Sequence, residues 1–476
     1  MPASRSFPFR MPGRSLPGAG LLALAGLAAT QLVAPVAPAQ AQETDPYLWL
    51  EEVEGERAME WVLEQNATSR QYLQNLPGYQ TLFDNTLAIY TSNERIAFPS
   101  IRGDAIYNFW TDGDHPRGVY RRTSWEDYLS GNPEWEVVLD MDALVAAEGT
   151  PWAFRGMNCL VPEERLCLVN LSPGGSDAVE VREFDLEEKR FVDGGFHVPV
   201  SKNTTAWIDE NTILVSHNLE ADRTTPSGYS AAARVWQRGT PLESAEVAVE
   251  AAPEDMAIFL GTQETTEGPV NVILRYITIF DFEYTVMRDG ELVTVDVPSD
   301  AQMGMVGDQM VLQLTSDWTV EGRTWEAGSV VSADVERFLA GDVEIELVVQ
   351  PDERSTINGF SATRDYLLVN QLTDVQGRLL RFQRDEDGWS STAIDTPEMG
   401  SVGIAAASVH DNRFFFTYSS FIQPSTLYFA DADGGIAEVA SLPDQFDAGG
   451  LVVEQHHATS KDGTRVPYFV VRPENA

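Results

Sequence analysis

Basic residues are scarce in this sequence. Its 476 residues include 32 lysines and arginines against 73 aspartates and glutamates, so the formal net charge at pH 7 is −41. Nucleic-acid-binding proteins need basic side chains to displace counterions from the phosphate backbone, and anionic membrane surfaces attract the same side chains. The composition therefore argues against nucleic acids and anionic membranes as partners. We interpret the acidity as a means of keeping the protein hydrated and soluble.

Cysteine is rarer still, with two residues, Cys159 and Cys167. They flank residues 162–165, whose proline and charged side chains predict a turn between two strands, so the two cysteines would meet across a hairpin. We favour a structural disulfide, and two free buried thiols are the alternative. A reactive or metal-binding role is disfavoured, because two thiolates alone do not form a zinc site and no histidine follows at ligand spacing.

The apolar stretch near the N-terminus is too short for a membrane span. Three arginines precede residues 21–29, and two prolines interrupt the weaker continuation, whereas a spanning helix needs about 20 apolar residues. Small residues at positions 39 and 41 suit a signal-peptidase site. We therefore predict a signal peptide over residues 1–41, cleavage after Ala41, and export to the periplasm or the outside of the cell, where disulfides are permitted.

One strand-turn-strand unit recurs through the central part of the chain. From about residue 86, short runs rich in β-branched and aromatic residues alternate with Gly, Asp and Asn turns, a pattern typical of strands. A further strong strand, such as residues 105–110, precedes each unit, and a weaker one fits ahead of most. The units centre near residues 129, 187, 239, 289, 338, 386 and 433, with spacings of 58, 52, 50, 49, 48 and 47 residues.

Repeats of about four strands with this period are typical of β-propeller blades. We therefore predict a mainly β fold with a seven-bladed β-propeller over residues 86–447. Two ordinary β-sandwiches with chance spacing are the alternative.

The segments that flank the repeats have different patterns. Residues 42–85 show helical spacing of apolar side chains, as in Met59, Val62 and Leu63, and predict an N-terminal helical segment. Residues 448–476 predict a β-hairpin with strands at 451–459 and 464–471 around a Lys-Asp-Gly turn.

The nucleophile motif of α/β-hydrolases, G-x-S-x-G, is absent from the sequence. The nearest match, residues 228–232, ends in alanine and runs into a predicted strand, whereas the motif requires a strand-to-helix turn. His456 and Ser460 would lie roughly 13 Å apart along one strand, too far for a proton transfer that needs about 3 Å. We therefore predict no catalytic residue in this chain.

Sites for a metal or cofactor are not predicted either. Residues 172–177 lack the lysine and helix of a phosphate-binding loop, and residues 385–388 and 431–435 lack the downstream glutamate of a calcium-binding EF-hand. We interpret all three segments as turns. The six histidines are scattered, at positions 115, 197, 217, 410, 456 and 457.

Several segments, in order along the chain, resemble the prolyl oligopeptidase family of serine peptidases. They are DPYLWLE at 45–51 with WV and QN at 61–62 and 65–66, LSPGGSDA at 171–178 with REFD at 182–185, RGTPL at 238–242 and ATSKDGTRVP at 458–467. The resemblance implies a seven-bladed propeller inserted into an α/β-hydrolase domain. It also implies that the propeller admits only short peptides, which a Ser, an Asp and a His in the C-terminal part cleave, commonly after proline.

Residues 448–476 resemble the start of that catalytic domain. We therefore expect a chain truncated before the catalytic Ser, Asp and His, whether as a fragment, by a frameshift or naturally, which is inactive alone and monomeric when complete. The alternative is a stand-alone exported propeller that binds peptides or acts as a scaffold. An unrelated propeller enzyme with a metal or quinone cofactor is a third interpretation.

Overall fold

The chain folds as two compact units, residues 1–84 and 85–476. The structure is a computed structural model that describes residues 45–52, 55–265, 268–288 and 290–475. The predicted signal peptide, residues 1–41, lies outside the described residues. The predicted domain boundaries at 85/86 and 447/448 stay predictions.

Helices make up the described part of the first unit. A short 3-10 helix, η1 (Leu48–Glu51), precedes α1 (Glu56–Gln74), and α2 (Tyr79–Tyr90) continues into the second unit. Gly78 connects α1 to α2 with a φ of +86°, a conformation that glycine adopts without strain. Residues 86–90 differ from the strand pattern predicted there: they complete α2, because a short apolar run fits a helix as well as a strand.

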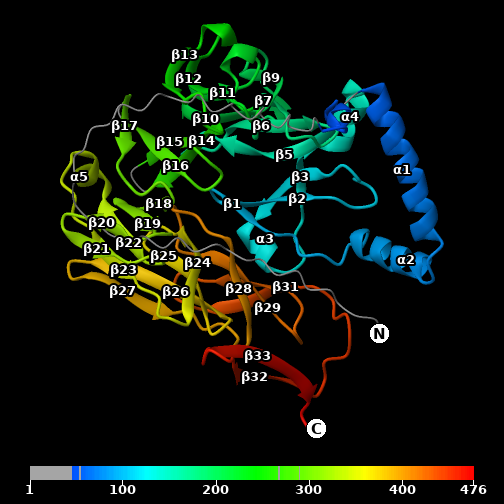
Figure 1. Cartoon of the computed structure of the whole chain (residues 1–476), viewed down its shortest axis with the longest axis vertical. Helices are drawn as coiled ribbons and strands as arrows, with labels where there is room; N and C mark the ends of the chain where they lie inside the picture. Colours follow the sequence, from blue (N-terminus) through cyan, green and yellow to red (C-terminus); the bar gives the residue numbers. More distant parts are fainter. Residues whose placement is uncertain (1–44, 53–54, 266–267, 289, 476) are drawn as a thin grey trace, which may run out of the picture. The chain divides into compact units, whose positions relative to one another are not determined.

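In its described residues, the second unit contains seven sheets of four or five antiparallel strands, which follow one another around a common axis (Figure 1), and two two-stranded sheets. Blade 1 contains β1 (Ser100–Arg102), β2 (Ala105–Trp110), β3 (Val119–Ser124) and β4 (Glu136–Asp140). Blade 2 contains β5 (Trp152–Cys159), β6 (Leu166–Pro173), β7 (Val179–Asp185) and β8 (Arg190–Phe191), with β9 (His197–Ser201) also paired to β7. Blade 3 contains β10 (Asn203–Asp209), β11 (Thr212–His217), β12 (Ala232–Gln237) and β13 (Glu246–Glu250).

The remaining blades repeat the same order. Blade 4 contains β14 (Ala257–Thr265), β15 (Gly268–Tyr276), β16 (Phe282–Arg288) and β17 (Glu291–Val295). Blade 5 contains β18 (Gln302–Val306), β19 (Gln309–Gln313), β22 (Val330–Asp334) and β23 (Glu346–Val349). Blade 6 contains β24 (Ser355–Ala362), β25 (Leu367–Thr373), β26 (Gln376–Asp385) and β27 (Gly388–Ala393), and blade 7 contains β28 (Gly400–Ala406), β29 (Phe414–Ser420), β30 (Thr426–Ala430) and β31 (Ile436–Ser441). The seven-bladed propeller predicted from the repeat is confirmed.

Short helices and two hairpins lie outside the strands of the blades. They are α3 (Trp125–Leu129), α4 (Met141–Glu148), α5 (Val335–Leu339), the 3-10 helices η2 (Ala221–Arg223) and η3 (Leu242–Ser244), and the hairpins β20 (Trp318–Val320) with β21 (Arg323–Trp325) and β32 (Leu451–Thr459) with β33 (Arg465–Pro473). Helices α3 and α5 stand where simple turns were expected. Ser124 and Asp334 explain the difference, because each side chain accepts a hydrogen bond from a backbone N–H of the first helical turn.

The first strand of each blade lies closest to the propeller axis. Sheet order follows chain order within the blades, and successive first strands such as β10, β14, β18 and β24 contact one another. Because the blades repeat around the axis, these strands all run in the same direction. Their carboxyl ends therefore gather at one mouth of the central channel.

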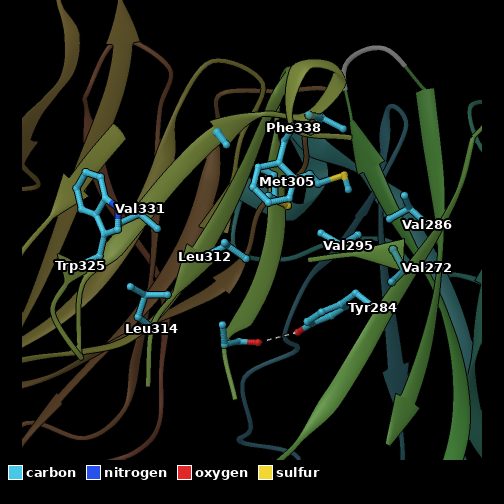
Figure 2. Close-up of a cluster of buried hydrophobic side chains, with 14 residues drawn as sticks. Val272, Tyr284, Val286, Val295, Met305, Leu312, Leu314, Trp325, Val331 and Phe338 are labelled. Carbon is cyan, nitrogen blue, oxygen red and sulfur yellow. Dashed lines mark hydrogen bonds between the residues drawn. The ribbon is translucent and has the colours of Figure 1, made fainter. Parts of the chain in front are cut away.

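Apolar side chains fill the space between neighbouring blades. Between blades 4 and 5, the Tyr284 hydroxyl also donates a hydrogen bond of 3.1 Å to the Ala301 carbonyl. Figure 2 shows this cluster, which includes Val272, Val286 and Val295 of blade 4 and Met305, Leu312, Val331 and Phe338 around blade 5.

The ring closes between blade 7 and blade 1 through side chains. Each of the two blades is a complete sheet of its own four strands. Phe415 of blade 7 stacks on Trp125 of blade 1 with 5.5 Å between ring centroids, and the Arg413 guanidinium lies 4.0 Å from the Trp125 ring centroid. Ile106 and Leu427 are fully buried in the same cluster. Apolar packing therefore joins the two ends of the propeller, and we call this contact the seam.

A disulfide joins Cys159 to Cys167 at the loop between β5 and β6. The two cysteines are paired residues in the register of these strands. Arg165, the last residue of this loop, donates two hydrogen bonds of 2.9 and 2.7 Å to Asp185 Oδ2. Burial by itself would raise the pKa of Asp185, but hydrogen bonds from Arg165 and from two backbone N–H groups outweigh it and hold the pKa below its usual range.

Phe415→Ala tests the seam. Deleting a buried aromatic side chain should lower the free energy of unfolding by about 3–5 kcal/mol, and amide hydrogen exchange in β2 and β3 should become faster. Phe416→Ala is the matched control, because Phe416 is equally buried but packs between blades 6 and 7. Equal exchange rates of β2 and β3 in the two variants would contradict a seam closed by Phe415.

Asp185→Asn tests the bracing of the β5–β6 loop. A carboxyl whose pKa is lowered by folding stabilises the protein above its unfolded pKa of about 4, and this contribution is lost as the pH falls through the lowered pKa. We expect the variant to lose about 1–3 kcal/mol of unfolding free energy at neutral pH and much less in strong acid. Denaturant unfolding at both pH values measures this, with Asp193→Asn, a fully exposed carboxyl, as the control.

Candidate functional site

A cavity of about 580 Å³ lies in the central channel of the propeller. Its wall comes from β1, β14, β18 and β24, from the residues just after β28, and from Glu164 in the loop after β5. Six of the seven blades therefore contribute to it. The lining residues include the carboxyl ends of β1, β14 and β24, so the cavity opens toward that mouth of the channel.

The channel wall is mostly polar. It carries three charged side chains, Arg102, Glu164 and Glu264. Hydroxyl and amide groups on such a wall match the alternating N–H and C=O groups of an extended peptide. The volume is within the range of about 300–1,000 Å³ that small-ligand pockets occupy. The uncharged polar residues of the wall are Ser100, Thr262, Gln263, Gln302, Ser361 and Ser408.

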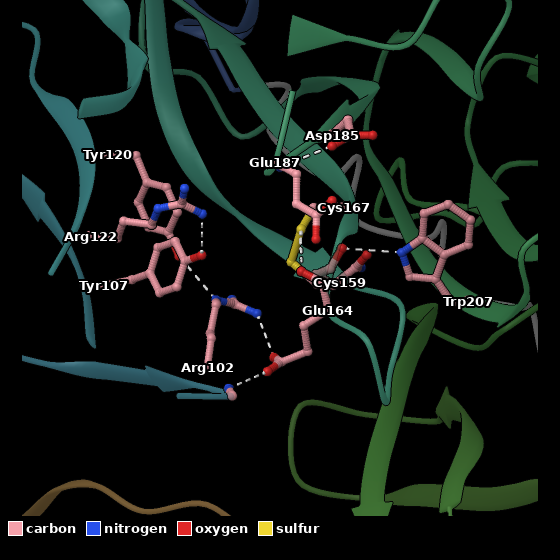
Figure 3. The surroundings of a disulfide bond; sticks show 12 residues. Arg102, Tyr107, Tyr120, Arg122, Cys159, Glu164, Cys167, Asp185, Glu187 and Trp207 are labelled. Carbon is pink, nitrogen blue, oxygen red and sulfur yellow. Dashed lines mark hydrogen bonds and ion pairs between the residues drawn. A yellow bond between two sulfur atoms is a disulfide. The ribbon is translucent and has the colours of Figure 1, made fainter. Parts of the chain in front are cut away.

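An ion pair between blades 1 and 2 lies at the mouth of the channel. Arg102 Nη1 lies 3.0 Å from Glu164 Oε1, and the Gly103 N–H donates a 3.0 Å hydrogen bond to the other carboxylate oxygen. Arg102 Nε donates to the Tyr120 hydroxyl at 3.0 Å. Figure 3 shows these contacts beside the Cys159–Cys167 disulfide. Glu164 is therefore fixed by blade 1 and by the disulfide-closed loop of its own blade.

Burial dominates the electrostatics of this ion pair. It raises the pKa of the Glu164 carboxyl, while Arg102 opposes the shift and the nearby Glu264 carboxylate adds to it. Burial by itself would lower the pKa of Arg102, but the attraction of Tyr120 and Glu164 outweighs it and the pKa rises. Arg102 is therefore a permanent positive charge at the mouth.

A second contact between ionisable side chains crosses the mouth. Glu264, near the end of β14, lies with Oε2 3.7 Å from Nε2 of His410, in the loop after β28. These side chains belong to blades 4 and 7, which are not neighbours in the ring. Both are well exposed, at 41% and 48%. Ionisable side chains from four blades thus gather at one mouth of the channel.

A more apolar cavity of about 710 Å³ lies where the chain enters and leaves the propeller. It is lined by residues from the end of α2, from 92–98, from the end of β2 and from 442–445. Trp110 and Phe98 give it large apolar surfaces. It lies beside the seam and not in the channel.

The residues considered as catalytic candidates from the sequence are dispersed. Ser230 is buried and its hydroxyl donates to the Ala232 carbonyl, so it stabilises the bend before β12. His456 lies on β32 beside Glu454, and Ser460 belongs to the turn after that strand. The part of the chain that the structure describes contains no group of three acidic, histidine or cysteine side chains placed to hold a metal ion.

Sequence reasoning missed the residues at the channel mouth. Arg102, Glu164, Glu264 and His410 stand at strand ends or in loops, where charged residues usually indicate a solvated turn. The cysteine pair was the one local signal, because it marked the loop that carries Glu164.

Within the described residues, no helix has the length and apolar character needed to cross a membrane.

Comparisons with known proteins agree with this architecture. Residues 34–442 match the family described as prolyl oligopeptidase, N-terminal β-propeller domain. The chain is 36% identical over 440 residues to the uncharacterized peptidase y4nA of Sinorhizobium fredii, covering 90% of this chain and 61% of that protein. It is 22% identical over 439 residues to a prolyl endopeptidase of Elizabethkingia miricola, covering 90% of this chain and 59% of the relative.

A solved structure has the same fold over most of the chain. The post-proline cleaving enzyme from Rickettsia typhi superposes with a TM-score of 0.82 at 25% identity, covering 90% of this chain and 65% of that enzyme. The chain therefore spans about three fifths of the length of the relatives it matches. The resemblance inferred from the sequence motifs is confirmed: this chain belongs to the prolyl oligopeptidase family and contains its N-terminal β-propeller domain.

Proposed function

We propose that this chain is the propeller part of a serine peptidase that hydrolyses short peptides, and that the channel admits them. The observation that carries the proposal is the polar cavity of about 580 Å³ on the axis of a propeller of this family. An extended peptide advances about 3.3 Å per residue, so a few residues fit such a space and a folded protein does not.

The proposal includes cleavage after proline by the whole protein. Its support is the 25% identity to the Rickettsia typhi enzyme, which is described as post-proline cleaving, over 90% of this chain. Catalysis itself is assigned to residues beyond this chain. The burial of Ser230 and the place of Ser460 in a hairpin turn support this assignment, because neither serine has a histidine base.

The C-terminal hairpin supports a further domain. It contacts the propeller through Gln376 Nε2, which donates to Gln455 Oε1 at 2.5 Å, and through the rings of Phe421 and Phe469, 5.2 Å apart. Exposed apolar side chains remain on β33 at Val466, Tyr468 and Val471. We propose that these side chains are covered in the complete peptidase.

Export of the protein is also a proposal. It rests on the sequence of residues 1–41, and the disulfide between Cys159 and Cys167 supports it, because stable disulfides are typical of oxidising compartments.

A fusion protein tests the proposed function. The chain alone should not hydrolyse an octapeptide with an internal proline, whereas its fusion to the C-terminal remainder of the Sinorhizobium fredii relative should cleave it, as measured by mass spectrometry of the products. A folded protein with exposed prolines should stay intact. Hydrolysis by the unfused chain, or a folded fusion that leaves the octapeptide uncut, would contradict the proposal.

A further inference from the structure

The cavity of about 710 Å³ beside the seam has walls from both ends of the propeller. Residues 88–98 lead into blade 1 and residues 442–445 follow blade 7, and residues of both segments line it together with the end of β2. Its volume is within the range of about 300–1,000 Å³ that small-ligand pockets occupy. We call it the seam cavity. A molecule bound in it contacts the two segments that meet at the seam.

Most of the wall of the seam cavity is apolar. Ile89 and Phe98 are 61% and 47% exposed, and Trp110, Leu442 and Pro443 also line the cavity. Large apolar side chains that meet water in a concave site are stabilised when a ligand covers them. The wall therefore favours a molecule with an apolar body.

One end of the seam cavity is positively charged. The Arg95 guanidinium lies 4.6 Å from the Trp110 ring centroid, and its Nε donates a 3.0 Å hydrogen bond to the Ser92 carbonyl. Its other nitrogens donate to the hydroxyl and the carbonyl of Thr111. These three contacts use at most three of the five N–H groups of an arginine, and all three acceptors are uncharged. Among the residues that the structure describes, no carboxylate forms an ion pair with Arg95.

A second arginine lies behind the same wall. The Arg121 guanidinium is also 4.6 Å from the Trp110 ring centroid, and its Nε donates to Asn108 Oδ1 at 3.2 Å. Both Trp110 and Asn108 line the seam cavity. Burial lowers the pKa of Arg121 to about 10, while Asp112 opposes the shift and Arg95 adds to it. Arg121 is therefore still charged at neutral pH.

Two carboxylates near this end form no ion pair with either arginine in the described part of the chain. Asp112 instead accepts hydrogen bonds from the Trp110 ring N–H at 3.1 Å and from the His115 backbone N–H at 2.7 Å. Glu94 lines the cavity but is exposed, so water and salt screen its charge. The sequence has 73 acidic residues, yet two arginines on one tryptophan lack an acidic partner. This arrangement indicates a site for an anion from outside the chain.

We propose that the seam cavity binds a small amphipathic anion, with its apolar body against Phe98 and Leu442 and its carboxylate or sulfonate beside Arg95. Aromatic acids and medium-length aliphatic acids are the class of ligand. A guanidinium suits this task, because its N–H groups bind such anions through strong, charge-assisted hydrogen bonds. Arg121 adds attraction from behind the wall. The site is separate from the cavity of the central channel, so the inference does not depend on the proposed peptide substrate.

Two fluorescent probes test the class of ligand. 8-Anilinonaphthalene-1-sulfonate carries an anionic group on an apolar aromatic body, and N-phenyl-1-naphthylamine has nearly the same body without the charge. In fluorescence titrations of the full chain at low salt, we expect a Kd about tenfold lower for the sulfonate, because a hydrogen bond to a charged group contributes enough for that factor.

Arg95→Met should remove this preference. The Kd of the sulfonate should rise about tenfold, whereas the Kd of the neutral amine should stay the same. Arg323→Met is the matched control, because Arg323 lies 3.6 Å from the Trp325 ring centroid but outside the cavity lining. It should change neither Kd.

Phe98→Ser locates the bound probe. We expect weaker binding of both probes, whereas Phe280→Ser, which alters a 73% exposed side chain after β15, should leave both Kd values unchanged. In the parent, the sulfonate should also slow amide hydrogen exchange in residues 88–98 and 442–445. Ile89→Ser, in the same wall, replaces Phe98→Ser if that variant does not fold.

Two results would overturn the proposal. One is equal affinity of the parent for the two probes. The other is a sulfonate Kd that neither Arg95→Met nor the wall variant changes, in proteins whose melting temperatures match that of the parent. Peptide hydrolysis is not measured in these titrations, so an inactive fusion protein would refute the proposed function and leave this inference standing.

Discussion

Packing between the first and last blades is the constraint on which the rest of the structure depends. Neighbouring blades elsewhere are joined by the chain itself, whereas blades 7 and 1 meet through side chains of the seam, such as Phe415 and Trp125. The central channel exists because this contact closes the ring. The wall of the cavity and the contact of Glu264 with His410 both need blade 7 at its closed position. Side-chain packing outside the cavity lining thus helps to position the polar groups of the channel.

Some of the few basic residues form ion pairs between neighbouring blades, a role that the net charge alone does not indicate. Arg238 of blade 3 makes two hydrogen bonds, of 2.7 and 3.0 Å, to the buried carboxylate of Glu183 in blade 2. Arg384 of blade 6 pairs in the same way with Glu346 of blade 5. A planar guanidinium fits a carboxylate through two parallel bonds, so an arginine on one sheet fixes its neighbour. The chain has a formal net charge of −41 and few basic residues, and these arginines are placed where they join neighbouring blades.

The repeat period predicted the fold because a blade is a local unit. Strand β2 covers residues 105–110, and β32 covers residues 451–459, as their alternation and turns predict. The disulfide was also accessible to sequence reasoning, since its cysteines are eight residues apart. The channel mouth was not, because it brings together strand ends from remote blades. Arg102 and Glu164, for instance, are separated by 62 residues, and no local pattern reports which strand ends meet at the axis. The end of α2, residues 86–90, was missed for a different reason, because its short apolar run fits a helix as well as a strand.

The seam also determines how the propeller responds to force. Ile96, just before blade 1, and Leu442, just after blade 7, both pack into the seam cluster. A load on the two segments that lead into and out of the propeller therefore reaches the side-chain contacts of the seam, together with the backbone hydrogen bond of 2.9 Å that the Leu442 N–H donates to the Ser425 carbonyl. Mechanically the propeller is a ring with one joint that side-chain packing closes, and a tension that draws the two segments apart acts on that joint.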